Sequence, residues 1–460
     1  MKLRPYQERA ISEIRQAFAD GARAPLLVSP TGSGKTVTFS AIAESSRQRG
    51  KRVLILCHRI ELVDQIVAAL GQFGIEPQII AADYPYRHGN PHVAVASVQT
   101  LIRRLHAVHE PTLIVVDECH HAASGSTWSK ILAHYKNAKV LGVTATPARL
   151  DGRGLGEHFD RLILGPSVRE LIEAGYLAKP RIFSPPTVDT SGLHIRAGEF
   201  KAEESESLMD TPRITGDALA HYRKFADGLP AIAFCVSVKH AHHVAEDFRK
   251  AGISAAALDG TTDKALRQMV VEDFRRGQIK VLANCQLFSE GFDVPGVHAG
   301  IFLRPTASLG LWLQQVGRIM RAFDGKPNAI LLDHVGNTIR HGLPDDDRAW
   351  ELTADSTAKK KTKQNVSCRV CPKCFAATRS GARQCIECGH VFEVEARIVD
   401  QVEGELVELT PEQMARKRER REQGRAQSLD QLREFARRKG YAPQWADHVF
   451  RARMAKRAGR

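Results

Sequence analysis

The chain has 460 residues, of which 43% are hydrophobic and 26% are charged. This length predicts two or three domains, and since no apolar run approaches a membrane span, no membrane segment is expected. The first residues lack the apolar core of a secretory signal, so we expect a cytoplasmic protein whose nine cysteines form no disulfides. The net charge of +14, much of it in residues 411–460, modestly favours a polyanionic partner such as nucleic acid.

Residues 24 to 165 alternate short apolar runs with amphipathic segments, which is typical of a parallel sheet covered by helices. The strands of this sheet are expected at residues 24–28, 52–57, 93–96, 113–116 and 139–143. Together with the segment that precedes them, they predict a first α/β domain over residues 1–165.

The first expected strand leads into the stretch LLVSPTGSGKT, Leu26 to Thr36. Glycines before a lysine, a hydroxyl residue and a helix-forming segment are typical of a loop that binds nucleotide phosphates at a helix N-terminus. In such a loop Lys35 reaches the β- and γ-phosphates and Thr36 holds Mg²⁺. Ser29 departs from the strict glycine pattern, so a structural turn is the alternative. The expected cradle comprises Pro30, Thr31, Gly32, Ser33, Gly34, Lys35 and Thr36.

Two acids, Asp117 and Glu118, follow the expected strand at residues 113–116. A strand end that carries Asp117 toward the phosphates would complete a Mg²⁺ site, and Glu118 would orient or deprotonate an attacking water. Acids after a buried strand are also common as caps. The two motifs in this order are more specific than either alone.

A second series of apolar runs predicts another α/β domain over residues 221–345, after a connecting segment at 166–220. Its strands are expected at residues 231–235, 254–258, 281–283, 299–303 and 329–332. Near its end, the helical spacing of Gln314, Arg318 and Arg321 places an amide and two guanidiniums on one helix face. Planar guanidiniums suit the charge on a transferring phosphoryl group, although surface arginines are usually only solvated.

With these motifs the chain resembles the superfamily 2 helicases and translocases of the DExH type over residues 1 to about 340. The segments that carry the resemblance are LRPYQ (3–7), SPTGSGKT (29–36), CHRIELVDQ (57–65), SVQTL (97–101), DECH (117–120), TATP (144–147), SEGFDVP (289–295) and QQVGRIMR (314–321). The resemblance implies two tandem RecA-like domains that bind ATP and Mg²⁺ in the cleft between them.

The resemblance also implies roles for individual residues. Catalysis falls to Lys35, Asp117, Glu118, Gln314, Arg318 and Arg321. Further nucleotide contacts fall to Arg4, Gln7, Gly291 and Asp293. Nucleic-acid contacts fall to Arg59, Ser97, Gln99, Thr100, Thr144, Thr146 and Asn284.

Within the superfamily, the chain is most similar to the RadD-like bacterial DNA-repair ATPases and their phage-borne relatives, through "LRPTASLGLWLQQVGRIMR", "LLDHVGN" and the cysteines that follow. This implies a DNA helicase with a role in repair or recombination and a single-strand-binding or repair protein as partner. RNA is the less expected nucleic acid. A duplex translocase that separates no strands is one alternative. A non-enzymatic nucleic-acid adaptor is another, which the intact ATP motifs argue against.

Four cysteines form a C-x₂-C, ten-residue, C-x₂-C pattern within an expected zinc ribbon at residues 367–395. Four thiolates at this spacing are able to close a tetrahedral Zn²⁺ site. The expected ligands are Cys371, Cys374, Cys385 and Cys388, with Cys368 as a possible alternative. The metal would mainly hold together a segment too small for its own core, although DNA contact is the other reading.

The ribbon lies between two polar segments. A basic, solvated linker is expected at residues 346–366, and a basic helical C-terminal module at 396–460. In that module Trp445, His448, Val449 and Phe450 are expected to form the core rather than to stack on bases, while nearby arginines either bind phosphate or only keep the module soluble.

Overall fold

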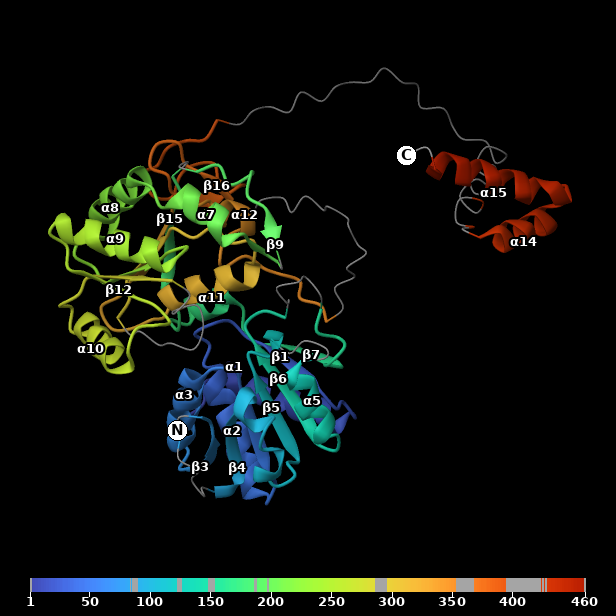
Figure 1. Ribbon diagram of the computed structural model, residues 1–460, viewed down its shortest axis with the longest axis horizontal. Helices are drawn as coiled ribbons and strands as arrows, with labels where there is room; N and C mark the ends of the chain where they lie inside the picture. Colours follow the sequence, from blue (N-terminus) through green and yellow to red (C-terminus); the bar gives the residue numbers. More distant parts are fainter. Residues whose placement is uncertain are drawn as a thin grey trace. The chain divides into compact units, whose positions relative to one another are not determined.

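The first lobe is built on a seven-stranded parallel sheet with the strand order β3-β4-β2-β5-β6-β1-β7 (Figure 1). Its strands are β1 (Pro25–Val28), β2 (Val53–Cys57), β3 (Pro77–Ile80), β4 (Asn90–Ser97), β5 (Leu113–Asp117), β6 (Lys139–Thr144) and β7 (Arg161–Leu164). The five strands expected from sequence are confirmed. The short edge strands β3 and β7 were not expected from the sequence.

This computed structural model describes residues 2–82, 84, 90–121, 126–147, 154–185, 188–196, 198–285, 296–352, 368–393, 423, 426 and 428–458. The chain divides into two compact units, Met1–Phe392 and Glu393–Arg460. No helix among the described residues has both the length and the apolar character that crossing a membrane requires.

Helices cover both faces of the first sheet, as continuous apolar strands require. One face packs against α1, α2 and α3 around Phe39 and Ile66, and the other packs against α4 and α5 around Leu101 and Trp128. The helical segments of this lobe are α1 (Pro5–Ala19), α2 (Lys35–Gln48), α3 (Ile60–Gly71), α4 (Val98–Leu101), η1 (Leu105–Ala107), η2 (Cys119–His121) and α5 (Thr127–His134).

The second lobe contains a six-stranded parallel sheet in the order β12-β13-β11-β14-β15-β8. Its strands are β8 (Lys179–Phe183), β11 (Ala231–Phe234), β12 (Ala255–Leu258), β13 (Val281–Asn284), β14 (Ala299–Phe302) and β15 (Asn328–Asp333). All five expected strands are present. The sixth, β8, comes from the segment at 166–220 that we expected only to connect the lobes, and it pairs with β15 at the sheet edge.

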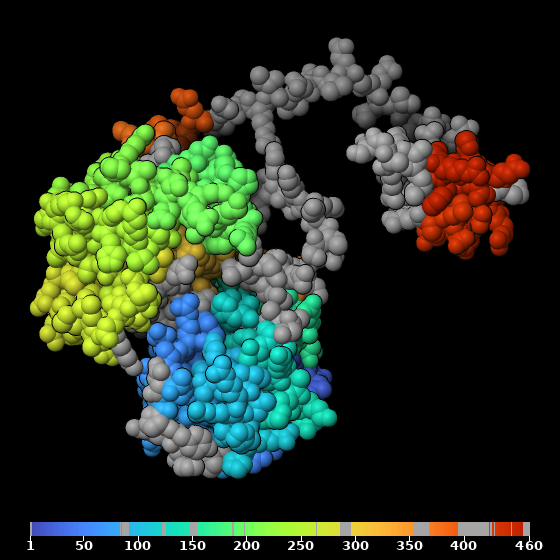
Figure 2. All heavy atoms as spheres, in the orientation of Figure 1, coloured from blue at the N-terminus to red at the C-terminus, as the bar shows by residue number. Residues whose placement is uncertain are grey.

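The second lobe is completed by helices and a small hairpin. In Figure 2 its atoms run from green to orange, and those of the first lobe from blue to teal. The helices are α6 (Val168–Glu173), α7 (Ala202–Met209), α8 (Pro212–Ala226), α9 (Val238–Lys250), α10 (Lys264–Arg275), α11 (Leu309–Ile319) and α12 (Asn337–His341), and the hairpin is β9 (Ile195–Arg196) with β10 (Glu199–Phe200).

The cysteine-rich segment packs on the second lobe. Its antiparallel strands β16 (Cys368–Val370) and β17 (Ala377–Arg379) lie near β8, where the Ser184 N–H donates to the Phe375 carbonyl at 2.8 Å. The Arg181 guanidinium forms a two-pronged ion pair with Glu387, whose shortest N–O distance is 2.6 Å. Buried Cys371 and Cys385 therefore join the core of the second lobe.

The second unit contains α14 (Leu429–Lys439) and α15 (Pro443–Ala458). A small core joins them, with Leu432 fully buried and Trp445, Val449 and Phe450 packed against it. His448 is not part of this cluster. A glycine in the left-handed conformation, Gly440 at φ +71°, ends α14 and turns the chain into α15.

Candidate active site

The phosphate loop follows β1 and ends where α2 begins. Gly32 and Gly34 adopt φ values of +87° and +79°, which side chains with a Cβ rarely adopt. This conformation directs the free N–H groups of the first turn of α2 toward one point, as anion binding requires. Ser29, the departure from the strict pattern, donates its hydroxyl to Ser33 Oγ at 2.7 Å and so braces the loop from within. Lys35 Nζ rests on the Ser29 carbonyl at 3.3 Å.

The start of α1 holds the same loop. Tyr6 Oη donates to the Ser33 carbonyl at 2.7 Å, and buried Gln7 Nε2 donates to the Ser33 and Gly34 carbonyls at 3.4 and 3.3 Å. Arg4 donates to Tyr6 Oη at 2.8 Å and lies 4.0 Å from the ring centroid of Tyr176, which follows α6. The two predicted residues, Arg4 and Gln7, thus lie beside the phosphate loop.

Asp117 ends β5 and is buried. Burial, together with the Glu118 carboxylate, raises its pKa to about 7, and the Lys35 ammonium opposes this rise. Glu118 adopts φ +47°, a strained conformation for a residue with a side chain that is typical of functional sites. The last residue of the DECH segment, His120, contacts the Thr144 hydroxyl at the end of β6, with Nδ1 and Oγ1 3.0 Å apart.

A cavity of about 330 Å³ brings together the motifs of both lobes. From the first lobe it is lined by the phosphate loop and the acid pair, and from the second by the end of α11. The predicted residues on its wall are Arg4, Thr31, Gly32, Gly34, Lys35, Thr36, Asp117, Glu118, Gln314, Arg318 and Arg321. Pro30 and Ser33 belong to the same loop but are not part of this wall.

The expectation that Gln314, Arg318 and Arg321 share one helix face is wrong in one respect. Helix α11 ends at Ile319, and Arg321 lies beyond it, in a bridge with Leu177. The arginine still reaches the cavity because this bridge, rather than the helical period, positions it. Burial lowers the pKa of Arg321, as expected for a guanidinium removed from water.

Comparison with known proteins places this site in a family. Residues 1–149 match the family "Type III restriction enzyme, res subunit", and residues 216–323 match "Helicase conserved C-terminal domain". A "51.5 kDa protein" of a Lactococcus phage is 37% identical over 373 residues, which cover 81% of this chain and 79% of that protein. The chain belongs to the superfamily 2 helicases of the DExH type.

Two further relatives agree. The "Putative ATP-dependent helicase IRC3" of Saccharomyces cerevisiae is 31% identical over 73% of this chain, which spans only 51% of that protein. A fragment of a putative HsdR subunit of a type I restriction enzyme from Vibrio vulnificus superposes with a TM-score of 0.58 at 25% identity, covering 75% of this chain and 67% of the fragment. This helicase is accordingly a nucleic-acid-dependent ATPase.

Lys326, which sequence reasoning missed, fixes the end of α11 in this helicase. Its ammonium donates to the carbonyls of Val297 at 2.6 Å, Arg321 at 2.9 Å and Ile319. Burial and the nearby Arg321 guanidinium lower the pKa of Lys326 to about 7, while three carbonyl acceptors match the three donors of the protonated form. The only signal in the sequence was a lone lysine beside Gly325, which carries no motif.

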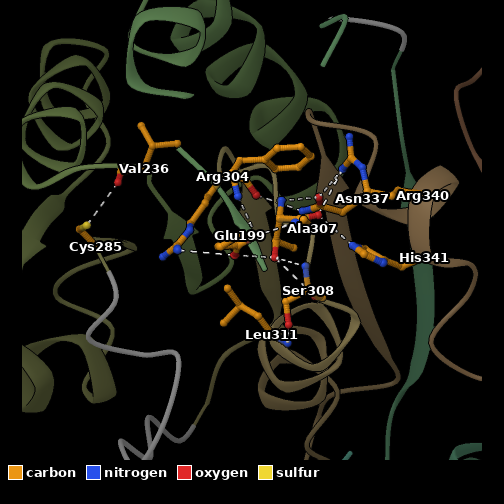
Figure 3. Close-up of polar contacts among 12 residues, drawn as sticks. Glu199, Val236, Cys285, Arg304, Ala307, Ser308, Leu311, Asn337, Arg340 and His341 are labelled. Atoms are coloured by element: carbon orange, nitrogen blue, oxygen red, sulfur yellow. Dashed lines mark hydrogen bonds and ion pairs between the residues drawn. The ribbon is translucent and has the colours of Figure 1, made fainter. Parts of the chain in front are cut away.

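The start of α11 is held by a carboxylate from the β9–β10 hairpin (Figure 3). Glu199 accepts hydrogen bonds from the Thr306 hydroxyl at 2.7 Å and the Ala307 N–H at 2.6 Å, and it lies 3.6 Å from Arg304. Asn337 accepts from the Thr306 N–H at 3.0 Å. Both ends of the helix that carries Gln314 and Arg318 are therefore fixed by polar side chains.

Several residues expected to contact nucleic acid are placed differently. Thr144, Thr146 and Asn284 are 0%, 1% and 1% exposed, so the structure gives them no surface for direct contact, which corrects that expectation. Thr144 instead links His120 to the Thr146 carbonyl, and Asn284 donates its amide to the Ala233 carbonyl. Thr144 and Asn284 are buried because they end the interior strands β6 and β13, and Thr146 lies two residues beyond β6.

The other expected nucleic-acid contacts lie nearer the surface of the first lobe. Gln99 is exposed and donates to the His58 carbonyl at 2.9 Å, while Arg59 and Thr100 are half-buried. Ser97 is mostly buried and caps α4 by accepting from the Thr100 N–H. Gly291 and Asp293, expected beside the nucleotide, lie outside the described residues.

Four thiols converge in the cysteine-rich segment. The Sγ atoms of Cys371, Cys374, Cys385 and Cys388 all lie within 4.8 Å of one another. Two pairs are 3.6 and 3.5 Å apart, close to the roughly 3.8 Å that a tetrahedral site with Zn–S bonds of about 2.3 Å requires. Cys368, the alternative ligand, instead directs its thiol to the Thr338 carbonyl at 3.5 Å. The donor set and its geometry fit a metal ion.

Proposed function

We propose that this helicase hydrolyses ATP in the cavity between its lobes and couples hydrolysis to movement on, or unwinding of, DNA. One observation carries the proposal: a single cavity is lined by Lys35 and Asp117 from one lobe and by Arg318 and Arg321 from the other. Groups of this kind on opposite lobes make the site complete only when the lobes approach each other.

The chemistry of the cavity assigns a task to each group. Lys35 and the N–H groups at the start of α2 bind the triphosphate, and Glu118 orients and deprotonates the attacking water. Arg318 and Arg321 stabilise charge on the transferring phosphoryl group, which is worth about 10³ to 10⁵ in rate for such arginines. Gln314 lies on the same cavity wall and is proposed to act with the two arginines on the phosphates.

Thr36 and Asp117 fit a Mg²⁺ ion, since a hydroxyl and a buried carboxylate share the cavity wall with Lys35. Bound there, Mg²⁺ would neutralise charge on the phosphate oxygens. Arg4 and Gln7 bind the nucleotide base, and Asp293 and Gly291 its sugar side, as the family resemblance implies.

Movement follows from alternate closure and opening of the lobes. Bound triphosphate bridges lysine and arginine and favours closure, and hydrolysis removes the bridge. The His120–Thr144–Thr146 contacts connect the acid pair to the end of β6, which gives the nucleotide state a route to the rest of the first lobe. Arg59, Gln99 and Thr100 lie at the carboxyl ends of β2 and β4, where a strand would bind.

DNA is the proposed substrate because the family matched by residues 1–149, and the superposed structure, are named for restriction enzymes, which act on DNA. A role in DNA repair or recombination, and a single-strand-binding or repair protein as partner, are the finer proposals. The second candidate is a duplex translocase that separates no strands. It is distinguished by ATPase activity on duplex without unwinding of a forked substrate.

We further propose the domain limits. The second lobe begins with β8 rather than at residue 221, since β8 completes its sheet. The ribbon at residues 367–395 is a Zn²⁺ site that stabilises its own fold and the edge of the second lobe. The linker expected at 346–366 precedes it, but its first residues are not all solvated, since Trp350 and Leu352 pack against the core of the first lobe. The basic helical module at 396–460 follows.

The test is ATP turnover titrated with single-stranded DNA, duplex, fork and RNA. Lys35→Ala is expected to abolish turnover, and Arg318→Ala to reduce kcat by about 10³ or more with little effect on ATP binding. Lys130→Ala, an exposed lysine on α5, serves as the control with wild-type turnover. Equal turnover in all three variants would refute the mechanism, and stimulation by RNA alone would refute the choice of DNA.

A further inference from the structure

The first lobe has a second large cavity, of about 750 Å³, at the amino ends of the strands, whereas the ATP site lies at their carboxyl ends. It lies between α1 and α2 and extends over the residues that precede β2, β5 and β6. Its floor is apolar and consists of Ile14, Phe18, Ile42 and Leu113. A concave apolar floor of this size accommodates bulky apolar side chains.

The rim of this cavity is strongly basic. Five exposed cationic side chains surround the floor, and Glu110 is the one carboxylate among the lining residues. Within the part of the chain that the structure describes, none of the five forms an ion pair. The cations are Arg15, Arg49, Lys51, Arg52 and Lys139.

Three of these cations are already oriented by the fold: Arg15 donates to the Ser45 hydroxyl at 3.0 Å, and two others donate to backbone carbonyls. Lys139 donates to the Phe18 carbonyl at 3.1 Å and lies 4.9 Å from the Phe18 ring centroid, and Arg52 Nε donates to the Glu110 carbonyl at 2.9 Å. Both keep donors free for another acceptor. Arg49 and Lys51 flank the turn between α2 and β2, where nothing in the described residues holds their charged ends.

The position of the cavity separates it from the nucleotide and nucleic-acid motifs. Leu113 and Lys139 are the first residues of β5 and β6, whereas Asp117 and Thr144 are the last. Since strands rise about 3.3 Å per residue, the amino and carboxyl ends of these strands lie roughly 15 Å apart. A nucleic acid that follows the carboxyl edge does not cover this surface.

We propose that this cavity docks an acidic peptide segment of a partner protein that carries a bulky apolar side chain. The carboxylates would pair with the basic rim, and the apolar side chain would fill the floor between α1 and α2. A nucleic-acid backbone matches the rim but offers no apolar group for the floor. Both features of the cavity thus have a counterpart only in the peptide.

The test uses the full chain and fluorescence anisotropy with three labelled dodecapeptides. The first contains six aspartates and two phenylalanines, the second replaces both phenylalanines with serine, and the third replaces the aspartates with lysine. We expect the first to bind, the second to bind at least tenfold more weakly, and the third not to bind. Equal binding of the first two peptides, or no binding of the first, would overturn the proposal.

Charge reversal locates the site. The double variant Arg49→Glu and Lys51→Glu is expected to bind the first peptide at least tenfold more weakly, with unchanged DNA-stimulated ATP turnover. Lys130→Glu with Lys239→Glu, two exposed lysines away from the cavity, is the matched control and should retain peptide binding. If the rim variant keeps the peptide, or loses DNA stimulation instead, the surface is not a peptide site.

Discussion

Gly317 of α11 and Thr31 of the phosphate loop approach each other so closely that a Cβ at Gly317 would lie 2.5 Å from the Thr31 Cβ. The same closeness occurs at Gly32, where a Cβ would lie 2.8 Å from Leu177 Cδ2. Two glycines on facing surfaces therefore let the backbones of the two lobes meet beside the ATP cavity. Any side chain at this contact has to separate them.

Gly317→Ala is predicted to reduce ATP turnover by about tenfold or more, because the added methyl group displaces the arginine-bearing helix from the phosphate loop. The control is Gly216→Ala in α8, where a Cβ meets nothing within 4 Å. Steady-state kinetics with both variants checks this. Wild-type kcat for Gly317→Ala would show that the contact is not formed during turnover.

Lys326→Met is predicted to lower kcat about tenfold while changing KM for ATP less, since the lysine fixes the backbone that carries Arg321 rather than the nucleotide. Three carbonyls lose their donor, so the free energy of unfolding should also fall by roughly 1–3 kcal/mol. Kinetics and denaturant unfolding measure the two effects. Lys179→Met, at an exposed lysine at the start of β8, controls for the loss of charge. A rise in KM for ATP with no fall in kcat would contradict the positioning role of Lys326.

We predict that metal analysis finds one Zn²⁺ ion per chain. Cys371→Ser should abolish Zn²⁺ binding, whereas Cys368→Ser should leave the ion bound. Because the ribbon shares the core of the second lobe and pairs Glu387 with Arg181, a strong chelator is expected to lower the melting temperature of the whole first unit. Calorimetry with and without chelator tests this. An unchanged melting temperature after complete loss of metal would show that the ribbon folds and docks without it.

The second lobe is predicted to lose stability in mild acid. Burial lowers the pKa of His240 to about 4, below its ordinary value near 6.5, while Asp210 opposes and His243 reinforces the shift. Between about pH 6.5 and 4, His240 therefore binds a proton in the unfolded chain but not in the folded chain. The contribution of His240 to stability is fully present above about pH 6.5 and decreases by about 1.4 kcal/mol per pH unit between pH 6.5 and 4.

The measurement is denaturant unfolding at pH 7.5, 6.0 and 5.0. His240→Gln should flatten the dependence on pH whatever its effect on absolute stability, and His134→Gln, at an exposed site in the first lobe, should not. His341, whose pKa burial lowers to about 4, adds to the wild-type slope. An identical slope in wild type and His240→Gln would contradict the assignment.

The amino-acid sequence by itself determined the two parallel sheets, the phosphate loop, the acid pair and the four thiols. Each of these depends on local information: continuous apolar runs, glycines that permit a left-handed turn, and short spacings between ligands. Lys35, Asp117 and Cys371 could therefore be identified before any contact was known. Helical spacing indicated Gln314 and Arg318, and the family resemblance assigned them to catalysis.

Only the tertiary structure decided how distant segments complete one another. Strand β8 joined the second sheet because its edge beside β15 was open to it, which no pattern within residues 166–220 indicated. Arg321 reached the cavity through its bridge with Leu177 after α11 had ended, and burial removed Thr144 and Asn284 from direct contact with nucleic acid. Such outcomes depend on packing between residues far apart in the chain. Local propensity does not indicate which of these distant segments pack together.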